Sequence, residues 1–206
     1  MIAIIDYDAG NIKSVEKALV ALGQDVVVTR DKQTILGADG VILPGVGAFG
    51  DAMQKLHDYN LVKTIYEVVE KKTPFLGICL GLQLMFESSE ETPGVEGLGL
   101  LKGKIVRIPE GDGLKIPHIG WNNLAYPNQG RLYKDIPENS YVYFVHSYYL
   151  QADEPEIVRA TCDYGVTIQA SVEKDNVFAC QFHPEKSSAV GMKILENFIK
   201  VVEGEN

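Results

Sequence analysis

The chain has 206 residues, of which 46% are hydrophobic and 23% charged, and this length and composition predict one compact domain over residues 1–206. Its 19 Lys and Arg residues against 28 Asp and Glu residues give a formal net charge of −9. So acidic a surface repels phosphate backbones and anionic lipid headgroups, which excludes nucleic acid and membrane surfaces as expected partners.

The sequence also predicts a cytoplasmic protein. The apolar stretch 73–86 is shorter than the roughly 18–20 apolar residues that span a bilayer, and Pro74 interrupts it. The N-terminus lacks a basic segment and reaches Asp6 too early for a signal peptide. The three cysteines are an odd number without C-x-x-C spacing, which argues against a disulfide framework and a zinc site. We therefore expect neither a metal nor another cofactor.

In the first half of the chain, short β-branched runs alternate with helical patterns, as in a parallel sheet covered by helices on both faces. The segment 34–36 is expected to be a turn. The predicted fold class is α/β, with a mixed, mostly parallel central sheet flanked by helices. The expected strands are residues 2–5, 26–29, 41–43 and 75–79, and the expected helices are residues 14–22, 51–56, 61–71 and 80–86.

Beyond about residue 88 the pattern changes to an alternation of period two, which is typical of mixed or antiparallel strands. Residues 174–176 predict a hairpin turn, and residues 189–202 predict a closing amphipathic helix. The strands expected in this half are residues 104–108, 141–150, 157–161, 167–172 and 177–182.

Residues 77–81 have the form G-x-C-x-G and lie between a predicted strand and a predicted helix. This is the arrangement of a nucleophile elbow, in which glycines leave room for a tight turn that exposes a strained nucleophile. At a helix N-terminus the free N–H groups favour the thiolate of Cys79, and the N–H of Leu80 points at a developing oxyanion. The motif alone is equally compatible with a buried apolar cysteine.

Residues 183–185, His-Pro-Glu, follow the last predicted strand. Side chains two residues apart in an extended segment point to the same side, so His183 and Glu185 have the spacing of an acid–base pair. A lone H-x-E is more often a surface histidine beside a solvated glutamate. Its coexistence with the elbow favours the catalytic interpretation, because Cys and His partners meet in space rather than in sequence.

The other histidines are weaker candidates. His57 falls in a polar helix, His118 in a mixed segment and His146 in a Tyr-rich strand, and no spacing among them indicates a metal site. An aromatic strand is more often packing than a ligand site, although the polar pair His146 and Ser147 in mid-strand needs a reason.

The loop 44–47, Pro-Gly-Val-Gly, is a second glycine loop after a strand. It lacks the spacing of either common nucleotide-binding glycine motif, so a nucleotide cradle is not expected. In an α/β sheet ligands collect at the carboxyl ends of strands, beside the Cys79 turn. The N–H groups of this loop are therefore candidates for a second oxyanion donor.

Six segments together resemble the class I glutamine amidotransferases, and among these most closely the glutaminase subunits of imidazole glycerol phosphate synthase. The elbow with His-Pro-Glu is specific for the class, whereas residues 4–12, 118–122 and 143–148 point to that subunit. Subunits that feed anthranilate or GMP synthesis usually carry His-Gln or Met-Gln where this chain has Leu82 and Gln83. The segments are residues 4–12, 44–50, 77–85, 118–122, 143–148 and 181–187.

The resemblance implies a role for each matching residue. Cys79 matches the nucleophile, His183 the acid and base, and Glu185 the carboxylate that orients it. It implies that Gln83, Ser147 and Tyr148 hold glutamine, that Leu80 with Val46 or Gly47 forms the oxyanion hole after a rearrangement of residues 44–47, and that Asn11, Trp121 and Tyr143 lie near a partner. Core packing is the alternative for Trp121 and Tyr143.

The implied reaction is hydrolysis of L-glutamine to glutamate and ammonia through a γ-glutamyl thioester. The ammonia would pass to a separate (β/α)8-barrel cyclase subunit, in a heterodimer, that makes imidazole glycerol phosphate and an aminoimidazole carboxamide ribotide. Three alternatives remain open from the residues. They are the glutaminase subunit of another amidotransferase, such as anthranilate or aminodeoxychorismate synthase, a non-catalytic amidotransferase-like binding module, and a free peptidase or γ-glutamyl hydrolase.

Overall fold

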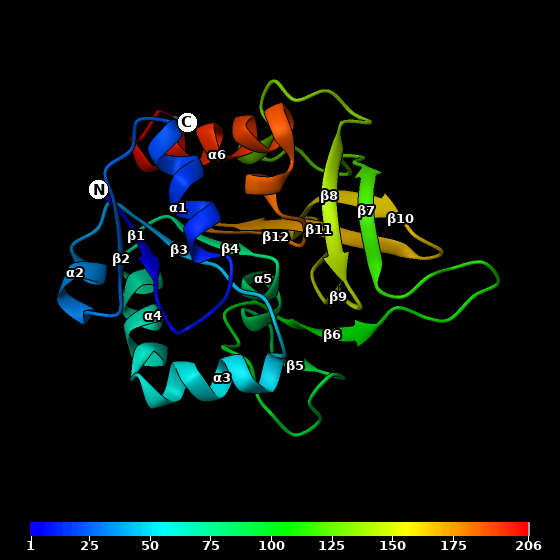
Figure 1. Cartoon of the computed structure of the whole chain (residues 1–206), viewed down its shortest axis with the longest axis horizontal. Helices are drawn as coiled ribbons and strands as arrows, with labels where there is room; N and C mark the ends of the chain where they lie inside the picture. Colours follow the sequence, from blue (N-terminus) through cyan, green and yellow to red (C-terminus); the bar gives the residue numbers. More distant parts are fainter. Residues whose placement is uncertain (206) are drawn as a thin grey trace.

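A central sheet with helices on both faces gives the protein the expected α/β architecture (Figure 1). The computed structural model describes residues 1–205. The strands of the sheet are β1 (Ile2–Ile5), β2 (Val26–Thr29), β3 (Gly40–Leu43), β4 (Phe75–Ile78), β10 (Val158–Asp163), β11 (Thr167–Lys174) and β12 (Val177–Cys180). Within the described residues they lie in the order β10-β11-β12-β4-β3-β1-β2. Neighbours from β12 to β2 run parallel, whereas β11 is antiparallel to β10 and β12.

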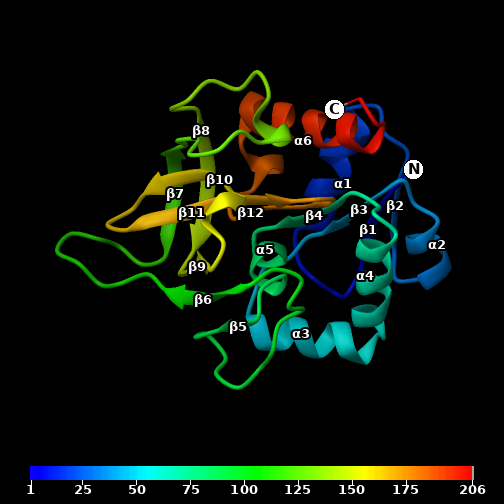
Figure 2. The ribbon, with the colours of Figure 1, turned by 180° about the vertical axis from the view of Figure 1, so that it is seen from behind.

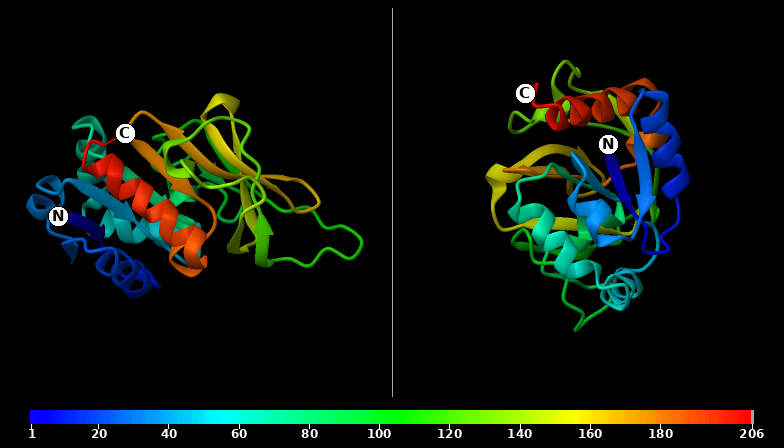
Figure 3. Two further views of the ribbon diagram at one scale, coloured as in Figure 1. Left: turned by 90° about the horizontal axis from the view of Figure 1, so that it is seen from above. Right: turned by 90° about the vertical axis from the view of Figure 1, so that its left-hand side faces the viewer.

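The helices form two layers, one on each face of this sheet (Figure 2). One layer holds α1 (Ile12–Ala21) and α6 (Ser188–Val202), and the other holds α2 (Lys32–Leu36), α3 (Phe49–Asp58), α4 (Leu61–Glu70) and α5 (Leu80–Leu84). Seen from above, α1 and α6 lie on the same side of the sheet (Figure 3). Successive side chains of a strand point to opposite faces, so Ile4 packs under α1 and α6 while Ile5 packs under the other layer. Burial on both faces explains why these strands are continuous apolar runs.

Two smaller sheets lie beside the β10–β11 end of the central sheet (Figure 1). One consists of β5 (Ser88–Ser89), β6 (Gly103–Arg107) and β9 (Tyr148–Ala152). The other is a two-stranded antiparallel ribbon of β7 (His118–Asn123) and β8 (Tyr141–His146), whose register pairs His118 with His146 and Trp121 with Tyr143. We call this second sheet the β7–β8 ribbon. Short 3-10 helices follow at Arg131–Tyr133, Pro155–Ile157 and Pro184–Lys186.

Residues 141–150 are not one strand, as the sequence predicts, but two. The chain breaks at Ser147, so that β8 pairs with β7 while β9 pairs with β6 in a different sheet. The carbonyl oxygen of Ser147 accepts a hydrogen bond from the N–H of Ile108 at 3.0 Å, which anchors the break. The polar pair His146 and Ser147 marks this point in the sequence, but the aromatic and β-branched residues on both sides of it predicted one continuous strand.

Residues 34–36 belong to a short helix rather than a turn. Asp31 precedes α2, and its carboxylate accepts a hydrogen bond from the N–H of Thr34 at 2.8 Å, which is an ordinary N-cap. The hairpin expected at residues 174–176 is confirmed, because Lys174 pairs with Val177 and Asp175 adopts a positive φ of 53°. Across residues 1–205, every helix is too short or too polar to cross a membrane.

Candidate active site

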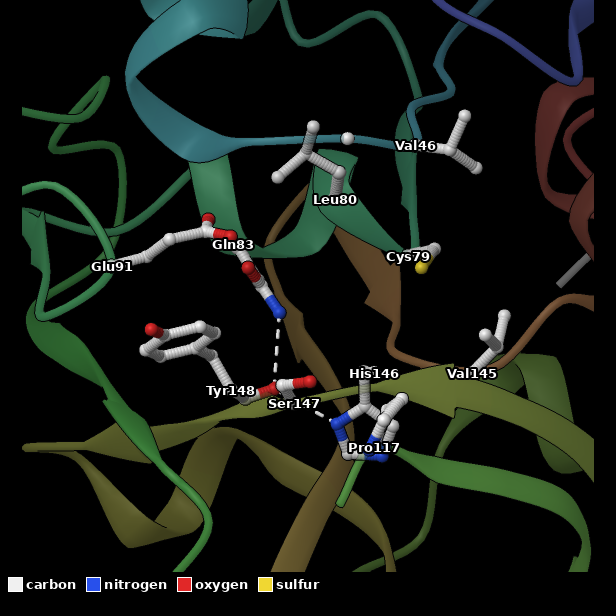
Figure 4. Close-up of a pocket in the computed structure, with 11 residues that line it drawn as sticks. Val46, Cys79, Leu80, Gln83, Glu91, Pro117, Val145, His146, Ser147 and Tyr148 are labelled. Carbon is white, nitrogen blue, oxygen red and sulfur yellow. Dashed lines mark hydrogen bonds between the residues drawn. The ribbon is translucent and has the colours of Figure 1, made fainter.

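Cys79 lies where β4 turns into α5, at the carboxyl end of the central sheet, and its φ of 55° is strained for a residue with a side chain. The flanking glycines make the turn possible. A Cβ on Gly81 would lie 2.0 Å from the carbonyl oxygen of Leu43, and one on Gly77 would lie 2.7 Å from that of Gly81. The turn leaves Cys79 only 6% exposed, in the wall of a pocket (Figure 4).

His183 reaches Cys79 because β12 and β4 are adjacent parallel strands. The N–H of Cys79 donates to the carbonyl oxygen of Cys180 at 2.8 Å, and the chain that leaves β12 brings His183 alongside. Main-chain atoms of Tyr143 hold this segment, since the N–H of His183 donates to the Tyr143 carbonyl at 3.0 Å. The pairing of β4 with β12 and the contact with Tyr143 therefore together place the two side chains near each other.

His183 and Glu185 form a buried ion pair, with 2.7 Å between Nδ1 and Oε1. Burial lowers the pKa of His183, but hydrogen bonds and charge interactions with Cys79 and Glu185 outweigh it and raise that pKa to about 9. The other ring nitrogen, Nε2, makes no hydrogen bond of regular geometry within residues 1–205. It is the nitrogen that remains for exchange of a proton with the thiol.

Asn11 joins this group from the start of α1. Its side-chain Nδ2 donates to Oε1 of Glu185 and lies 3.4 Å from Nδ1 of His183. The sequence predicted Asn11 only as a residue near a partner, and its contact with the carboxylate is new. More than 170 residues separate the groups in the chain, so no local pattern signals this contact.

A pocket of about 390 Å³ opens beside Cys79. Gln83 lines it from α5, and its Nε2 donates both to the carbonyl oxygen of Tyr148 and to Oε1 of Gln181, each at 3.1 Å. Gln181 in turn directs its Nε2 at Sγ of Cys79, 3.8 Å away. The residues that line the pocket are Val46, Gly47, Cys79, Leu80, Gln83, Glu91, Pro117, Val145, His146, Ser147 and Tyr148.

The structure thus brings the predicted glutamine-holding residues Gln83, Ser147 and Tyr148 together in one pocket with Cys79 (Figure 4). Glu91 also lines this pocket, and its Oε2 accepts a hydrogen bond from the N–H of Phe49 at 2.8 Å. Sequence reasoning missed Glu91, because one carboxylate in an acidic loop carries no distinguishing signal.

The predicted oxyanion donors are not aligned in this structure. The N–H of Leu80 donates to the carbonyl oxygen of Gly45 at 3.2 Å, so it does not face the pocket as a free donor. Val46 is exposed and Gly47 has a φ of 108°, a conformation that suits glycine. Behind the loop, the buried hydroxyl of Tyr7 donates to the carbonyl oxygen of Pro44 at 2.6 Å.

The β7–β8 ribbon presents an apolar outer face. Trp121 is 50% exposed and its ring centroid lies 6.1 Å from that of the half-buried Tyr143. Ile119 and Tyr141, on the same face by strand alternation, are 59% and 56% exposed. Core packing therefore does not account for Trp121.

The inner face of the ribbon carries a buried pair of histidines. Nδ1 of His118 lies 3.0 Å from Nε2 of His146. Burial lowers the pKa of His118 to about 4 and that of His146 to about 3, so both rings are neutral at pH 7. Within residues 1–205 no three His, Cys, Asp or Glu side chains converge as metal ligands.

Comparison of the sequence with known proteins finds one matching family and similar proteins of about the same length. Residues 3–202 match the family described as glutamine amidotransferase class-I. The chain is 52% identical over 201 residues to the imidazole glycerol phosphate synthase subunit HisH of Moorella thermoacetica, covering 98% of this chain and 95% of that protein. It is 48% identical over 202 residues to the same-named subunit of Methanocaldococcus jannaschii, covering 98% and 100%.

Solved structures show the same fold at low sequence identity. A crystal structure of a glutamine amidotransferase matches with a TM-score of 0.77 at 18% identity, covering 98% of this chain and 100% of that one. PurLQS from Thermotoga maritima matches with a TM-score of 0.73 at 21% identity, covering 98% of each chain.

Proposed function

Because the chain belongs to the glutamine amidotransferase class-I family, we propose that it is the glutaminase subunit of imidazole glycerol phosphate synthase. One observation carries the proposal: Cys79, His183 and Glu185 converge beside a pocket that residues matching the family's glutamine-binding positions line. The identity of 52% to a subunit of that name gives the synthase. Residues 1–206 form a single amidotransferase domain in this proposal.

The chemistry begins with the thiol of Cys79. The thiolate forms with the thiol proton on Nε2 of His183, because the raised pKa of this ring favours the imidazolium, and the thiolate attacks the side-chain carboxamide carbon of L-glutamine. Glu185 holds Nδ1 of the ring and stabilises the imidazolium. The tetrahedral adduct breaks its C–N bond, His183 returns the proton to nitrogen, and ammonia leaves a γ-glutamyl thioester. Water then attacks the thioester with His183 as base, which releases glutamate and restores the thiol.

The pocket supplies groups for the rest of the substrate. The carboxylate of Glu91 complements the α-ammonium group of glutamine, while Gln83, Ser147 and Tyr148 offer polar atoms around its path to Cys79. During attack, negative charge develops on the carboxamide oxygen. That charge needs two N–H donors, which Leu80 and either Val46 or Gly47 supply once residues 44–47 rearrange.

Ammonia needs a receiver, because in water it is protonated and diluted. The proposed receiver is a (β/α)8-barrel cyclase subunit in a heterodimer, which makes imidazole glycerol phosphate and an aminoimidazole carboxamide ribotide. The exposed aromatic face around Trp121 and Tyr143 supports a partner on this side of the triad, because aromatic residues are common anchors of interfaces. A cytoplasmic location is part of the proposal, since a catalytic thiol stays reduced there.

The test is to purify the chain with candidate synthase subunits and to measure glutamate release. We expect the cyclase, and neither anthranilate nor aminodeoxychorismate synthase subunits, to co-purify and to stimulate release. Cys79→Ala should abolish activity and labelling by a glutamine-like electrophile, measured by mass spectrometry. Cys162→Ala, at another buried free cysteine, is the matched control and should retain both. Glutamate release by Cys79→Ala at the unmodified rate would overturn the proposal.

A further inference from the structure

His146 lies between the candidate glutamine pocket and the interior of the β7–β8 ribbon. It lines the pocket, yet its side chain makes no contact that the proposed reaction uses. Its Nδ1 lies 2.8 Å from the carbonyl oxygen of Tyr148, and its Nε2 lies 3.0 Å from Nδ1 of His118. His146 is thus a buried, neutral imidazole whose two nitrogens both have hydrogen-bond partners, and the proposed reaction does not explain these contacts.

The partners fix the proton on each ring. A carbonyl oxygen only accepts, so Nδ1 of His146 carries a proton and, in the neutral ring, its Nε2 is an acceptor. Nδ1 of His118 must then be the donor to it, which leaves Nε2 of His118 as an acceptor. That nitrogen lies 3.4 Å from Nδ2 of Asn122, a donor. Every hydrogen bond in the series therefore points the same way, toward Tyr148.

The far end of the series is anchored as well. Nδ2 of Asn122 also donates to the carbonyl oxygen of Asp163 at 2.7 Å, and its Oδ1 accepts the N–H of Asn123 at 2.9 Å. These contacts fix the orientation of the Asn122 amide. The ring of His118 is stacked between Phe144 and Tyr164, with centroids 4.7 and 3.9 Å away. Neither the Asn122 amide nor the His118 ring therefore has much freedom to turn.

The near end of the series meets the substrate pocket at one atom. The carbonyl oxygen of Tyr148 accepts hydrogen bonds from both His146 and Gln83, as the dashed lines of Figure 4 show. Gln83 also bonds Gln181, which contacts Sγ of Cys79. A displacement of the Tyr148 carbonyl would therefore move the side chain that lines the glutamine site next to the nucleophile.

We propose that His118 and His146 are a positioning pair that fixes the Tyr148 carbonyl and thereby holds Gln83 in place for L-glutamine. The inference rests on the proposed function, because it assigns a task within the same pocket. The pair also ties the pocket to β7, whose outer face carries the exposed Ile119 and Trp121. Neither histidine exchanges a proton with the substrate.

The test uses two substitutions at His118 in the complex with the cyclase. His118→Asn keeps an N–H donor at the place of Nδ1, whereas His118→Leu fills the same space without a donor. We expect His118→Leu to raise the KM for glutamine about tenfold, the effect of losing one buried hydrogen bond, with kcat changed less. His118→Asn should restore KM to within about threefold of the unsubstituted chain. His57→Leu, at an exposed histidine of α3, is the matched control and should leave both constants unchanged.

An unchanged KM in His118→Leu, or an equal loss in both variants, would overturn the proposal. A second measurement needs no foldable variant. In the full chain labelled with ¹⁵N-histidine, the imidazole nitrogen shifts should give the neutral tautomer protonated on Nδ1 for both residues at pH 7. Any other tautomer, or a charged ring, contradicts the pair. Absence of glutaminase activity with the tautomers as expected would instead count against the proposed function alone.

Discussion

The N–H of Leu80 and the carbonyl oxygen of Gly45 are hydrogen-bonded at 3.2 Å. Leu80 directly follows the candidate nucleophile, at the first position of α5, so its N–H is the one that an oxyanion beside Cys79 would need. In this arrangement the Gly45 carbonyl occupies that N–H, which is then not free for an oxyanion. The proposed triad is therefore assembled in this structure while one of the proposed oxyanion donors is engaged elsewhere.

We expect the isolated chain to release glutamate slowly and the complex with its cyclase to release it at least about a hundredfold faster, the usual effect of one oxyanion donor. The physical reason is that turning residues 44–47 frees the Leu80 N–H. The measurement is the steady-state kcat for glutamine with and without saturating partner. Equal kcat values in the two conditions would show that the Gly45 contact does not limit the reaction.

Gly45→Ala should damage the loop itself. A Cβ at this position would lie 2.2 Å from the hydroxyl of Tyr7 and 3.1 Å from Cβ of Leu80, in a space enclosed by buried side chains. We expect a loss of about 1–3 kcal/mol in the free energy of unfolding, typical of overpacking, together with reduced activity in the complex. Urea denaturation gives the first quantity. Gly111→Ala is the control, because its Cβ would meet its nearest atom at 3.8 Å, and its midpoint should stay unchanged.

The ion pair of His183 and Glu185 predicts a dependence of stability on pH. The pKa of His183 is raised to about 9 in the fold, above its ordinary value of 6.5, so its proton stabilises the folded state. This contribution is complete below pH 6.5 and is lost as the pH rises through about 9. The substitution Glu185→Gln removes the carboxylate charge that helps to raise the pKa of His183. That pKa should therefore fall, and the free energy of unfolding should decline less over this pH range.

Denaturation of both forms between pH 6 and 9.5 checks this expectation, and NMR titration of His183 gives its pKa directly. Parallel stability curves for the two forms would contradict it. Glu185→Gln should also lower kcat about a hundredfold or more, because the ring loses the group that orients it.

Trp121→Ala should weaken the complex with the cyclase. Half of the Trp121 side chain is exposed in the free chain, and exposed aromatic residues of this kind are common hot spots worth about 2 kcal/mol or more. Isothermal titration calorimetry would then give a dissociation constant at least about thirtyfold higher. Val20→Ala, at a side chain of α1 that is 56% exposed, is the control. An unchanged dissociation constant for Trp121→Ala would move the interface elsewhere.

Local sequence patterns predicted much of the fold and singled out Cys79, His183 and Glu185, which the fold places beside one pocket and whose roles in the reaction are proposed. The apolar runs of β1 to β4 have the composition that burial on both faces demands, and helices follow them at regular intervals. Gly77 and Gly81 flank Cys79 because only glycine fits the close approach of neighbouring main chain. Such steric requirements restrict the residue types within a few positions of Cys79, so a single sequence is enough to recognise them.

Contacts between segments that are distant in the chain could not be predicted from local patterns. Asn11 donates to Glu185, and Gln181 contacts Cys79, yet neither residue type is unusual in its own segment. The bond between His118 and His146 depends on the register of the β7–β8 ribbon. The sequence did not predict β7, since residues 118–123 lack a clear alternation of apolar and polar side chains.

Hydrogen bonds between the main chains of β4 and β12 set the spacing of Cys79 and His183, and these bonds do not depend on which side chains the strands carry. The placement of Cys79 and His183 is consequently independent of most other side chains on these two strands. The β7–β8 ribbon contacts His183 through the main-chain carbonyl of Tyr143, and this hydrogen bond does not depend on which side chains the outer face carries. Side chains on the outer face of the ribbon can therefore change while the main-chain hydrogen bonds that place Cys79 and His183 stay the same.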